Sequence, residues 1–130
     1  MSRQVNAITR TGRRAVELRF ILRNSLEKLV ASAFQLDETL LRMPTRGRAR
    51  VARARQVAMY LAHTACGRSL TEVGEMFERD RTTVAHACVV IEEAREDAEF
   101  DRAVDLLELS SSIILTQAVL PMVLEDQESF

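Results

Sequence analysis

The sequence predicts an all-α protein whose single domain is a helical bundle organised around a helix-turn-helix. Apolar residues recur at the three- and four-residue spacing of helices rather than in strict alternation. Aromatic residues make up 5% of the chain, with 4 Gly and 2 Pro, whereas Ala, Leu, Arg and Glu are frequent. At 130 residues, with a hydrophobic content of 47%, one domain can bury a core without crosslinks.

Residues 1–12 show no helical periodicity, and we expect a disordered basic tail with Arg3 and Arg10 as loose charges. This segment has no apolar h-region, so it lacks the pattern of a secretion signal. No apolar run of the length that spans a bilayer is apparent, and no membrane partner is expected. These features predict a cytoplasmic protein.

Residues 13–34 carry apolar side chains at helical spacing. They form one helix or two, because Asn24 followed by Glu27 also fits a capping box. Asp37 is expected to cap a short helical turn in which the leucines at 40–41 point inward.

Residues 42–50 break the helical pattern with a proline and a glycine, and they alternate Arg46, Arg48 and Arg50 with small residues. We expect a flexible basic loop. Such an arm can lie along phosphates or place a guanidinium in a narrow minor groove. A solvated connector with counterions is the plainer alternative.

Residues 51–66 form the most regular predicted helix, and Gly67 follows where a C-terminal cap belongs. Arg53, Tyr60 and His63 lie off its apolar stripe. Arg53 and His63 are candidates for contact with a DNA backbone, although a plain surface histidine is an equal alternative for His63. The stripe itself consists of Ala54, Val57, Ala58, Leu61, Ala62 and Ala65.

Residues 69–91 have the pattern of two short helices joined by a tight turn. Ser69, with Glu72 three residues later, has the form of a capping box. Gly74 allows two helices to approach closely, and Asp80 is a good N-cap for the second helix. The inward face of that second helix would be Val84, Ala87, Cys88 and Ile91.

The outward face of the second helix carries one cation, short hydroxyl donors and small side chains on its first turns. Such a face suits the reading of base edges in a major groove, where arginine pairs with guanine and threonine methyls touch thymine. The candidate base-reading residues are Arg81, Thr82, Thr83, Ala85 and His86. Further candidates are Asp80, as an acceptor from a base amino group, and Arg53, His63, Ser69 and Thr71, as phosphate contacts.

A resemblance to a known family runs through VARARQVAMYLAHTACGRSLTEVGEMFERDRTTVAHA. A basic loop, an R-Q-x-A-M-x-L helix at 55–61, an S-L-x-E-[IV]-G helix at 69–74 and a D-H-T-T-V-type helix start at 80–84 follow in order. Together they resemble the C-terminal, duplex-binding domain of the bacterial replication initiator DnaA. The resemblance covers roughly residues 25–109, and it is nearer to small stand-alone DnaA-related proteins of alphaproteobacteria than to an initiator.

The resemblance implies an all-α fold similar to the Trp repressor, with the recognition helix in the major groove and a loop arginine in the adjacent minor groove. Three departures from the family pattern bear on specificity. Arg81 stands where the family usually has a base-contacting histidine, after a turn that is one residue shorter and lacks the usual double glycine. Ala85 replaces a larger apolar residue. Val89 and Val90 occupy positions that are basic in the family.

After this motif the helix is expected to continue as an acidic stretch, with Asp101 as the cap of a further helix. Residues 114–124 are densely apolar and contain Pro121, which should end or kink that helix. The segment either docks on the 13–34 helix or forms a partner surface, including one for a homodimer.

Charge is strongly segregated although the net charge is only -1. Residues 1–88 carry a balance of +8, and residues 89–130 carry a balance of -9. A basic body with an acidic tail is frequent among nucleic-acid binders; solvated faces that merely differ in sign are the alternative. The domain is expected to span residues 13–124, with an acidic tail at 125–130.

Cys66 and Cys88 lack a CxxC spacing and are expected to be buried thiols. His63 and His86 lie in separate predicted helices. No catalytic constellation, cofactor motif or metal-ligand pattern appears, so neither an enzyme nor a cofactor is expected.

The leading functional prediction is sequence-specific binding of double-stranded DNA at DnaA-box-like sites by a nucleoid-associated protein of the cytoplasm. Such binding would regulate the initiation of chromosome replication or the transcription of nearby genes. The alternative is a protein-interaction module that competes with DnaA for a regulatory partner and so modulates initiation without needing DNA. In that case DnaA or a DnaA regulatory protein is the partner.

Overall fold

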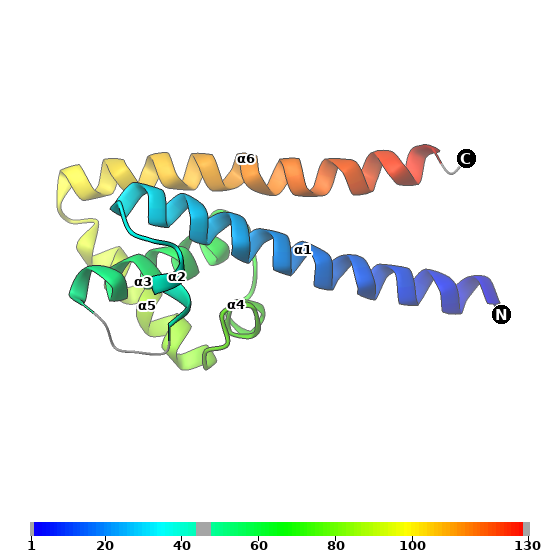
Figure 1. Ribbon diagram of the computed structural model, residues 1–130, viewed down its shortest axis with the longest axis horizontal. Coiled ribbons are helices and arrows are strands. Elements are labelled where there is room, and N and C mark those ends of the chain that lie inside the picture. Colours follow the sequence, from blue (N-terminus) through cyan, green and yellow to red (C-terminus); the bar gives the residue numbers. More distant parts are fainter. Residues whose placement is uncertain (1, 44–47, 129–130) are drawn as a thin grey trace.

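The computed structural model describes residues 2–43 and 48–128, with side chains from Gly12 onward up to Gln127. Within these ranges the chain is built from six helices and has no strand, which confirms the predicted all-α class (Figure 1). The helices are α1 (Ser2–Phe34), α2 (Thr39–Arg42), α3 (Ala49–Thr64), α4 (Leu70–Phe77), α5 (Arg81–Ala94) and α6 (Ala98–Glu128).

Two long helices, α1 and α6, lie side by side and run in opposite directions (Figure 1). Helix α1 lies between α6 and the compact group formed by α2 to α5. The N-terminal part of α1 and the C-terminal part of α6 project beyond that group on the same side. The helix-turn-helix of α4 and α5 therefore lies on one side of α1, and α6 packs on the other side of α1.

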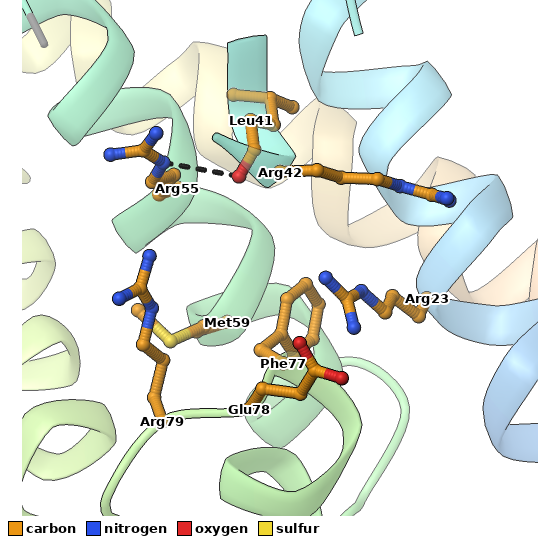
Figure 2. Close-up of a pocket in the computed structure, with 8 residues that line it drawn as sticks. All are labelled: Arg23, Leu41, Arg42, Arg55, Met59, Phe77, Glu78 and Arg79. Carbon is orange, nitrogen blue, oxygen red and sulfur yellow. Dashed lines mark hydrogen bonds between the residues drawn. The ribbon is translucent and has the colours of Figure 1, made fainter. Parts of the chain in front are cut away.

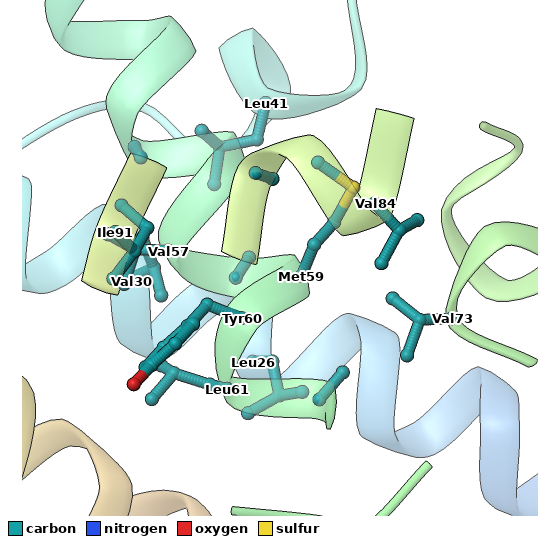
Figure 3. Packing of buried hydrophobic residues seen from close by; sticks show 14 of the residues in the cluster. Leu26, Val30, Leu41, Val57, Met59, Tyr60, Leu61, Val73, Val84 and Ile91 are labelled. Carbon is teal, nitrogen blue, oxygen red and sulfur yellow. The ribbon is translucent and has the colours of Figure 1, made fainter. Parts of the chain in front are cut away.

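The core is a cluster of mostly aliphatic side chains to which each of the six helices contributes, including Leu41 of α2 (Figure 3). The predicted stripe on α3 is buried from Ala54 to Ala62, whereas Ala65 is half-buried. Tyr60, expected to lie off the stripe, is only 2% exposed. Burial of a phenol at this position requires a partner for its hydroxyl, and that partner comes from elements distant in sequence.

The N-terminal prediction of a disordered tail over residues 1–12 differs from the structure, in which α1 already begins at Ser2. Helix α1 is also one helix and does not restart at Asn24. The reason is that the Glu27 carboxylate is buried and accepts a hydrogen bond from Arg42 Nε at 2.9 Å, with Arg23 Nε 3.4 Å away, so it does not reach back to cap a new helix.

The predicted turn after α1 is present. Gln35, at φ +55°, follows the end of α1. Asp37 Oδ1 accepts hydrogen bonds from the Thr39 backbone N–H at 2.9 Å and from its hydroxyl at 2.8 Å, which lowers the pKa of the Asp37 carboxyl. Of the two leucines that follow, Leu41 is buried and Leu40 is half-buried against the core.

The predicted start of the last helix at Asp101 is wrong. Helix α5 ends at Ala94 and α6 begins at Ala98, because the Asp97 carboxylate accepts from the Phe100 N–H at 2.9 Å. Pro121 does not end the helix, which runs on to Glu128. Pro121 and Gln117 are both exposed, so solvent can satisfy the Gln117 carbonyl that the proline cannot bond.

Helix α6 docks on α1, as one of the two sequence alternatives proposed. Arg14 Nη1 lies 2.6 Å from Asp126 Oδ2, and Ile114 and Leu115 pack against the core. Its other face is exposed, so the partner-surface alternative also stays open. The expectation that no apolar segment is long enough to cross a membrane is wrong. By length and composition alone Ala98–Gln127 is such a segment, because it contains an 18-residue window with a mean hydropathy of 1.6.

Candidate nucleic-acid interface

Helix α4 begins at the predicted cap. Ser69 Oγ accepts a hydrogen bond from the Glu72 backbone N–H at 3.1 Å. The Glu72 side chain does not reach back to the Ser69 backbone as in a full capping box. One of its carboxylate oxygens lies instead 3.9 Å from both Arg19 and Arg68. One side-chain cap and one acidic residue in the first turn therefore fix where α4 starts.

The turn between α4 and α5 depends on Gly74. Glu78 follows α4 with φ +55°, in the left-handed region, and the Arg79 N–H donates to the Gly74 carbonyl at 2.9 Å. A Cβ atom on Gly74 would lie 2.6 Å from the Arg79 carbonyl oxygen. The absence of a side chain at Gly74 therefore makes room for the backbone of the turn at Arg79. The sequence had predicted that this glycine makes room for a second helix.

Asp80 occupies the predicted N-cap of α5 in an extended conformation, with φ -65° and ψ 148°. Its carboxylate makes no capping hydrogen bond, so the side-chain half of that prediction is wrong. The short turn places the carboxylate in solvent beside the helix start, where it is free to accept a hydrogen bond from another molecule.

The two faces of α5 are divided as predicted. Val84, Ala87 and Ile91 are buried, and Cys88 is half-buried. Ala85 is also half-buried, which leaves only part of its methyl group for an outside contact. The exposed outward side chains of the first turns are Arg81, Thr82, Thr83 and His86.

A surface hollow lies at the junction of α4 and α5. It brings together four of the predicted site residues, Thr71, Asp80, Arg81 and Thr83, with Gly74, Glu75, Glu78 and Arg79. Three carboxylates and two guanidinium groups therefore share this small surface. Glu75 is engaged by Arg19 Nη1 at 3.1 Å, so one of the three negative charges is paired.

Three predicted DNA contacts are engaged by the chain itself. Arg50 lies in the first turn of α3, where its guanidinium donates to the Phe34 carbonyl, with Nε at 3.0 Å, and stacks 5.6 Å from the Phe34 ring centroid. Arg53 lies 5.7 Å from the Phe100 ring centroid, beside the start of α6. His63 Nδ1 is 2.7 Å from the Arg68 carbonyl oxygen, a distance at which it donates. Each of these three side chains therefore has a contact within the fold that the sequence did not predict.

The basic loop is only partly described. Arg46 lies outside the described residues. Arg48 is exposed and immediately precedes α3. Because Arg50 belongs to the helix and is held by the end of α1, Arg48 is the arginine of this set that projects from the described part of the loop.

A second hollow contains arginines from four separate segments: Arg23, Arg42, Arg55 and Arg79 (Figure 2). Arg55 donates to the Leu41 carbonyl at 3.1 Å and so ties α3 to the end of α2. Burial, with a smaller effect from the nearby Arg79, lowers the pKa of Arg55. The Arg79 side chain is exposed and rises from the turn toward Arg55.

Arg79 is the cation that the sequence prediction omitted from the site. Its only signal in the sequence is its place immediately before Asp80, the N-cap of α5. Both hollows include Arg79, so this residue links the recognition turn to the basic surface behind it.

Cys66 is buried and Cys88 is half-buried, both as free thiols, and burial raises the pKa of each. Cys66 Sγ lies 3.8 Å from the Ser111 carbonyl oxygen. Among the side chains that the structure describes, no group of three or more His, Cys, Asp or Glu residues is arranged to hold a metal ion.

Comparison with solved structures places this geometry among replication initiators. The chain is similar to a DNA replication initiation factor, with a TM-score of 0.69 and 29% identity over 83% of this chain. It is also similar to a replication initiator DnaA bound to AMPPCP and single-stranded DNA, with a TM-score of 0.66 and 29% identity over 85% of this chain. For AMPPCP-bound DnaA from Aquifex aeolicus, the TM-score is 0.62 and the identity 31% over 77% of this chain.

The chain spans about a third of each of these larger proteins: 32%, 32% and 30% of their lengths. The family model described as the bacterial dnaA protein helix-turn-helix matches residues 24–91. That segment runs from the middle of α1 to the buried Ile91 of α5 and includes the whole recognition turn. The chain therefore belongs to the bacterial DnaA-protein helix-turn-helix family.

Proposed function

We propose that this protein binds double-stranded DNA at DnaA-box-like sites and thereby regulates the initiation of chromosome replication or the transcription of nearby genes. The observation that carries the proposal is the exposed outward side of the first turns of α5. Arg81, Thr82, Thr83 and His86 project from a helix whose opposite face is buried in the core. A recognition helix in a major groove requires this division between a rigid inner face and a polar outer face.

The side chains at the start of α5 can make specific contacts with the edges of bases. The Arg81 guanidinium can donate to guanine O6 and N7, and the threonine methyl groups of Thr82 and Thr83 can contact thymine. The Asp80 carboxylate, which makes no capping hydrogen bond, can accept a hydrogen bond from a cytosine amino group. The half-buried Ala85 offers a smaller apolar contact, which supports a sequence preference different from that of the initiators.

Phosphate contacts would surround this reading face. Thr71 and Arg79 share the hollow with Asp80 and Arg81, while Ser69 stands at the start of α4. Arg48, together with Arg46, would flank or enter the minor groove from the basic loop. We propose a nucleoid-associated, cytoplasmic location on the same grounds, because a protein with these contacts would be held on chromosomal DNA.

An electrophoretic mobility shift on a DnaA-box duplex, compared with a scrambled duplex of equal length at stated salt concentrations, tests the proposal. We expect preferential binding to the box at salt concentrations that release the scrambled duplex. Equal affinity for both duplexes would reject sequence-specific binding. Absence of binding to either one would reject the DNA-binding proposal itself.

A second function is supported by Val89, which is 55% exposed on α5 at a position that is basic in the family. An exposed apolar side chain at this position, and separately the acidic residues of α6, suit a protein partner better than a phosphate backbone. The chain would then compete with DnaA for a regulatory partner. A variant with Arg81→Ala and Thr82→Ala that no longer binds DNA but retains its effect on initiation would favour this function. Loss of both properties together would reject it.

A further inference from the structure

The hollow that gathers Arg23, Arg42, Arg55 and Arg79, which we call the arginine hollow, is built by the tertiary fold (Figure 2). Its guanidinium groups come from α1, α2, α3 and the turn before α5. Its volume is about 160 Å³. One water molecule needs about 15 Å³ of such space, whereas pockets for drug-sized ligands begin near about 300 Å³. The hollow therefore has room for a small ligand, or for one end of a larger ligand.

The described residues around the arginine hollow do not balance its positive charge. Its four arginines meet two carboxylates: that of Glu78, which lines the hollow, and that of Glu27, which accepts a hydrogen bond from Arg42 Nε at 2.9 Å. This leaves a balance of +2. Like charges that are brought together cost free energy unless an opposite charge lies near them. An anion with two negative charges would complete the balance.

Arg23 shows the shortage of acceptors. Its Nε atom is buried without a hydrogen-bond partner among the described residues, 3.4 Å from the same Glu27 oxygen that Arg42 approaches more closely. Its Nη1 donates to the Met76 carbonyl at 2.8 Å, and its guanidinium lies 5.5 Å from the Phe77 ring centroid. The Arg23 side chain is thereby fixed in position while its charge is only partly compensated.

Arg79 lies across the hollow from Arg23, with Phe77 and Met59 between them (Figure 2). Its side chain is exposed, and no described residue forms a hydrogen bond or ion pair with it. It extends toward Arg55, which is held by backbone carbonyls of α2. These two cations repel each other, and an anion bound beside them would replace that repulsion with attraction.

The charge and the directions of the donors favour a phosphate monoester over other anions. A carboxylate is planar and carries one charge, so the fork of one arginine satisfies it. A phosphodiester of the DNA backbone also carries one charge. A phosphate monoester carries about −1.5 to −2 charges near neutral pH and presents three acceptor oxygens. That charge matches the balance of +2, and the three oxygens suit guanidinium groups on opposite walls.

We propose that the arginine hollow binds the phosphate monoester group of a small phosphorylated molecule, held between Arg23 and Arg79. The volume of the hollow admits little beyond the phosphate group, so the rest of the molecule lies outside it. A neighbouring hollow shares Arg23, Arg42 and Glu78 and is also lined by Phe20, whose side chain is 66% exposed. The Phe20 ring offers a surface on which the organic part of the ligand packs.

Arg79 connects this site to the recognition turn. Its side chain also lines the hollow that holds Asp80 and Arg81. A phosphate group bound to Arg79 in the arginine hollow neutralises the charge that Arg79 would otherwise offer to DNA, so the ligand and DNA compete for this residue. This competition rests on the proposed DNA binding, whereas the binding of the phosphate group does not.

Titration with methyl phosphate, followed through the arginine Nε–H signals in NMR spectra, tests the site without DNA. The comparison anions are dimethyl phosphate, a diester with one charge, and acetate, all at one ionic strength set with sodium chloride. We expect saturable shifts of the Arg23 and Arg79 signals with methyl phosphate, and affinities about tenfold weaker for the other two anions. Equal affinities for the three anions, or shifts that do not saturate, would overturn the proposal.

Three variants locate the bound anion. Arg79→Gln should weaken methyl phosphate binding by about tenfold, because a charge-assisted contact is lost from an exposed side chain that the fold does not require. Arg102→Gln changes an exposed arginine of α6 outside the hollow, so this matched control should bind like wild type. Glu78→Gln should strengthen binding, because it removes a negative charge from the lining. Equal losses in the two arginine variants, or weaker binding by Glu78→Gln, would overturn the site.

Mobility shifts on the DnaA-box duplex, with methyl phosphate or with sodium chloride of the same ionic strength, test the competition. Saturating methyl phosphate should lower the DNA affinity of wild type by about fivefold or more and leave that of Arg79→Gln unchanged. Equal sensitivity of both proteins would overturn competition through Arg79.

The same samples separate the possible sources of the phosphate group. A duplex that moves the Arg23 signal to its methyl phosphate-bound position would identify the DNA backbone as the source and reject a free ligand. A wild-type protein that binds methyl phosphate in the hollow but binds no duplex would support this site and reject only the proposed DNA binding.

Discussion

The Tyr60 hydroxyl accepts a hydrogen bond from Arg95 Nη1 at 3.0 Å and donates its own proton to the Glu92 carboxylate. Arg95 also binds Asp101 and Glu108, each at 2.6 Å, and a further carboxylate at Asp105. One phenol and one guanidinium thus connect α3, the end of α5 and the start of α6. The contact fixes the start of α6 against α3 and the end of α5.

This contact predicts a pH dependence of stability. Burial, with the hydrogen bond to Glu92, raises the pKa of Tyr60 to about 12, whereas an unfolded tyrosine titrates near 10. Between these values the unfolded chain loses the phenol proton first, so the contribution of Tyr60 to the free energy of unfolding is constant below about pH 10 and falls as the pH rises toward 12. Urea denaturation over this range should show that slope in wild type.

Tyr60→Phe is the matched variant for that measurement. It should lose the part of the alkaline slope that comes from Tyr60 and be less stable by about 1 kcal/mol at neutral pH, because a hydrogen bond is removed from a buried network. An identical alkaline slope in both proteins would show that Tyr60 is not the titrating group.

Gly74→Ala should destabilise the fold by about 1–3 kcal/mol, because the new methyl group would overlap the Arg79 carbonyl. DNA affinity should fall as well, since the turn that carries Asp80 must move. Gly12→Ala is the control: it lies in α1 with nothing within 4 Å of its added Cβ, so helix propensity alone should leave it neutral or stabilised by about 1 kcal/mol. In thermal denaturation the midpoint temperature of Gly74→Ala should therefore fall, whereas that of Gly12→Ala should stay the same or rise.

Glu78→Gly should stabilise the protein by about 1 kcal/mol, because it relieves a left-handed conformation that non-glycine residues adopt at a cost. It should also tighten DNA binding by removing a carboxylate from the hollow that holds Arg79 and Arg81. Glu78→Gln separates the two effects, since it removes the charge and keeps the backbone cost. An equal gain in stability for Glu78→Gln would contradict the backbone explanation.

Thr82→Ala should weaken binding to the preferred duplex by about 1–3 kcal/mol while leaving the scrambled duplex nearly unaffected. The exposed Thr82 hydroxyl and methyl have no structural role in the described fold that would spread the loss to all sequences. Fluorescence anisotropy with both duplexes measures the difference. Equal losses on the two would remove Thr82 from the base-reading set.

Arg48→Ala and Arg50→Ala should have different effects although they lie two residues apart. Arg48→Ala should weaken binding to every duplex and reduce the salt slope by about 1, as expected for a phosphate contact. Arg50→Ala should instead lower stability by about 1–2 kcal/mol, because it loses the Phe34 carbonyl and ring. If Arg50→Ala lowered the salt slope with no change in stability, Arg50 would be the phosphate contact.

The sequence alone determined the helical class, the capped start of α4 at Ser69 and the divided faces of α5. These features depend on neighbours three or four residues apart, which periodicity and capping chemistry report directly. Their register is set locally, so a prediction from local sequence was sufficient for the recognition turn and most of its exposed residues.

Only the tertiary structure decided which polar side chains remain available. Arg50 and Arg53 look like free cations in the sequence, but aromatic rings from α1 and α6 occupy them. Tyr60 lies off the apolar stripe and is nevertheless buried, because Glu92 and Arg95 arrive from another helix to satisfy its hydroxyl. Spacing along one helix carries no information about partners on other helices, 16 to 35 residues away for Arg50 and Tyr60, so these assignments required the packed fold.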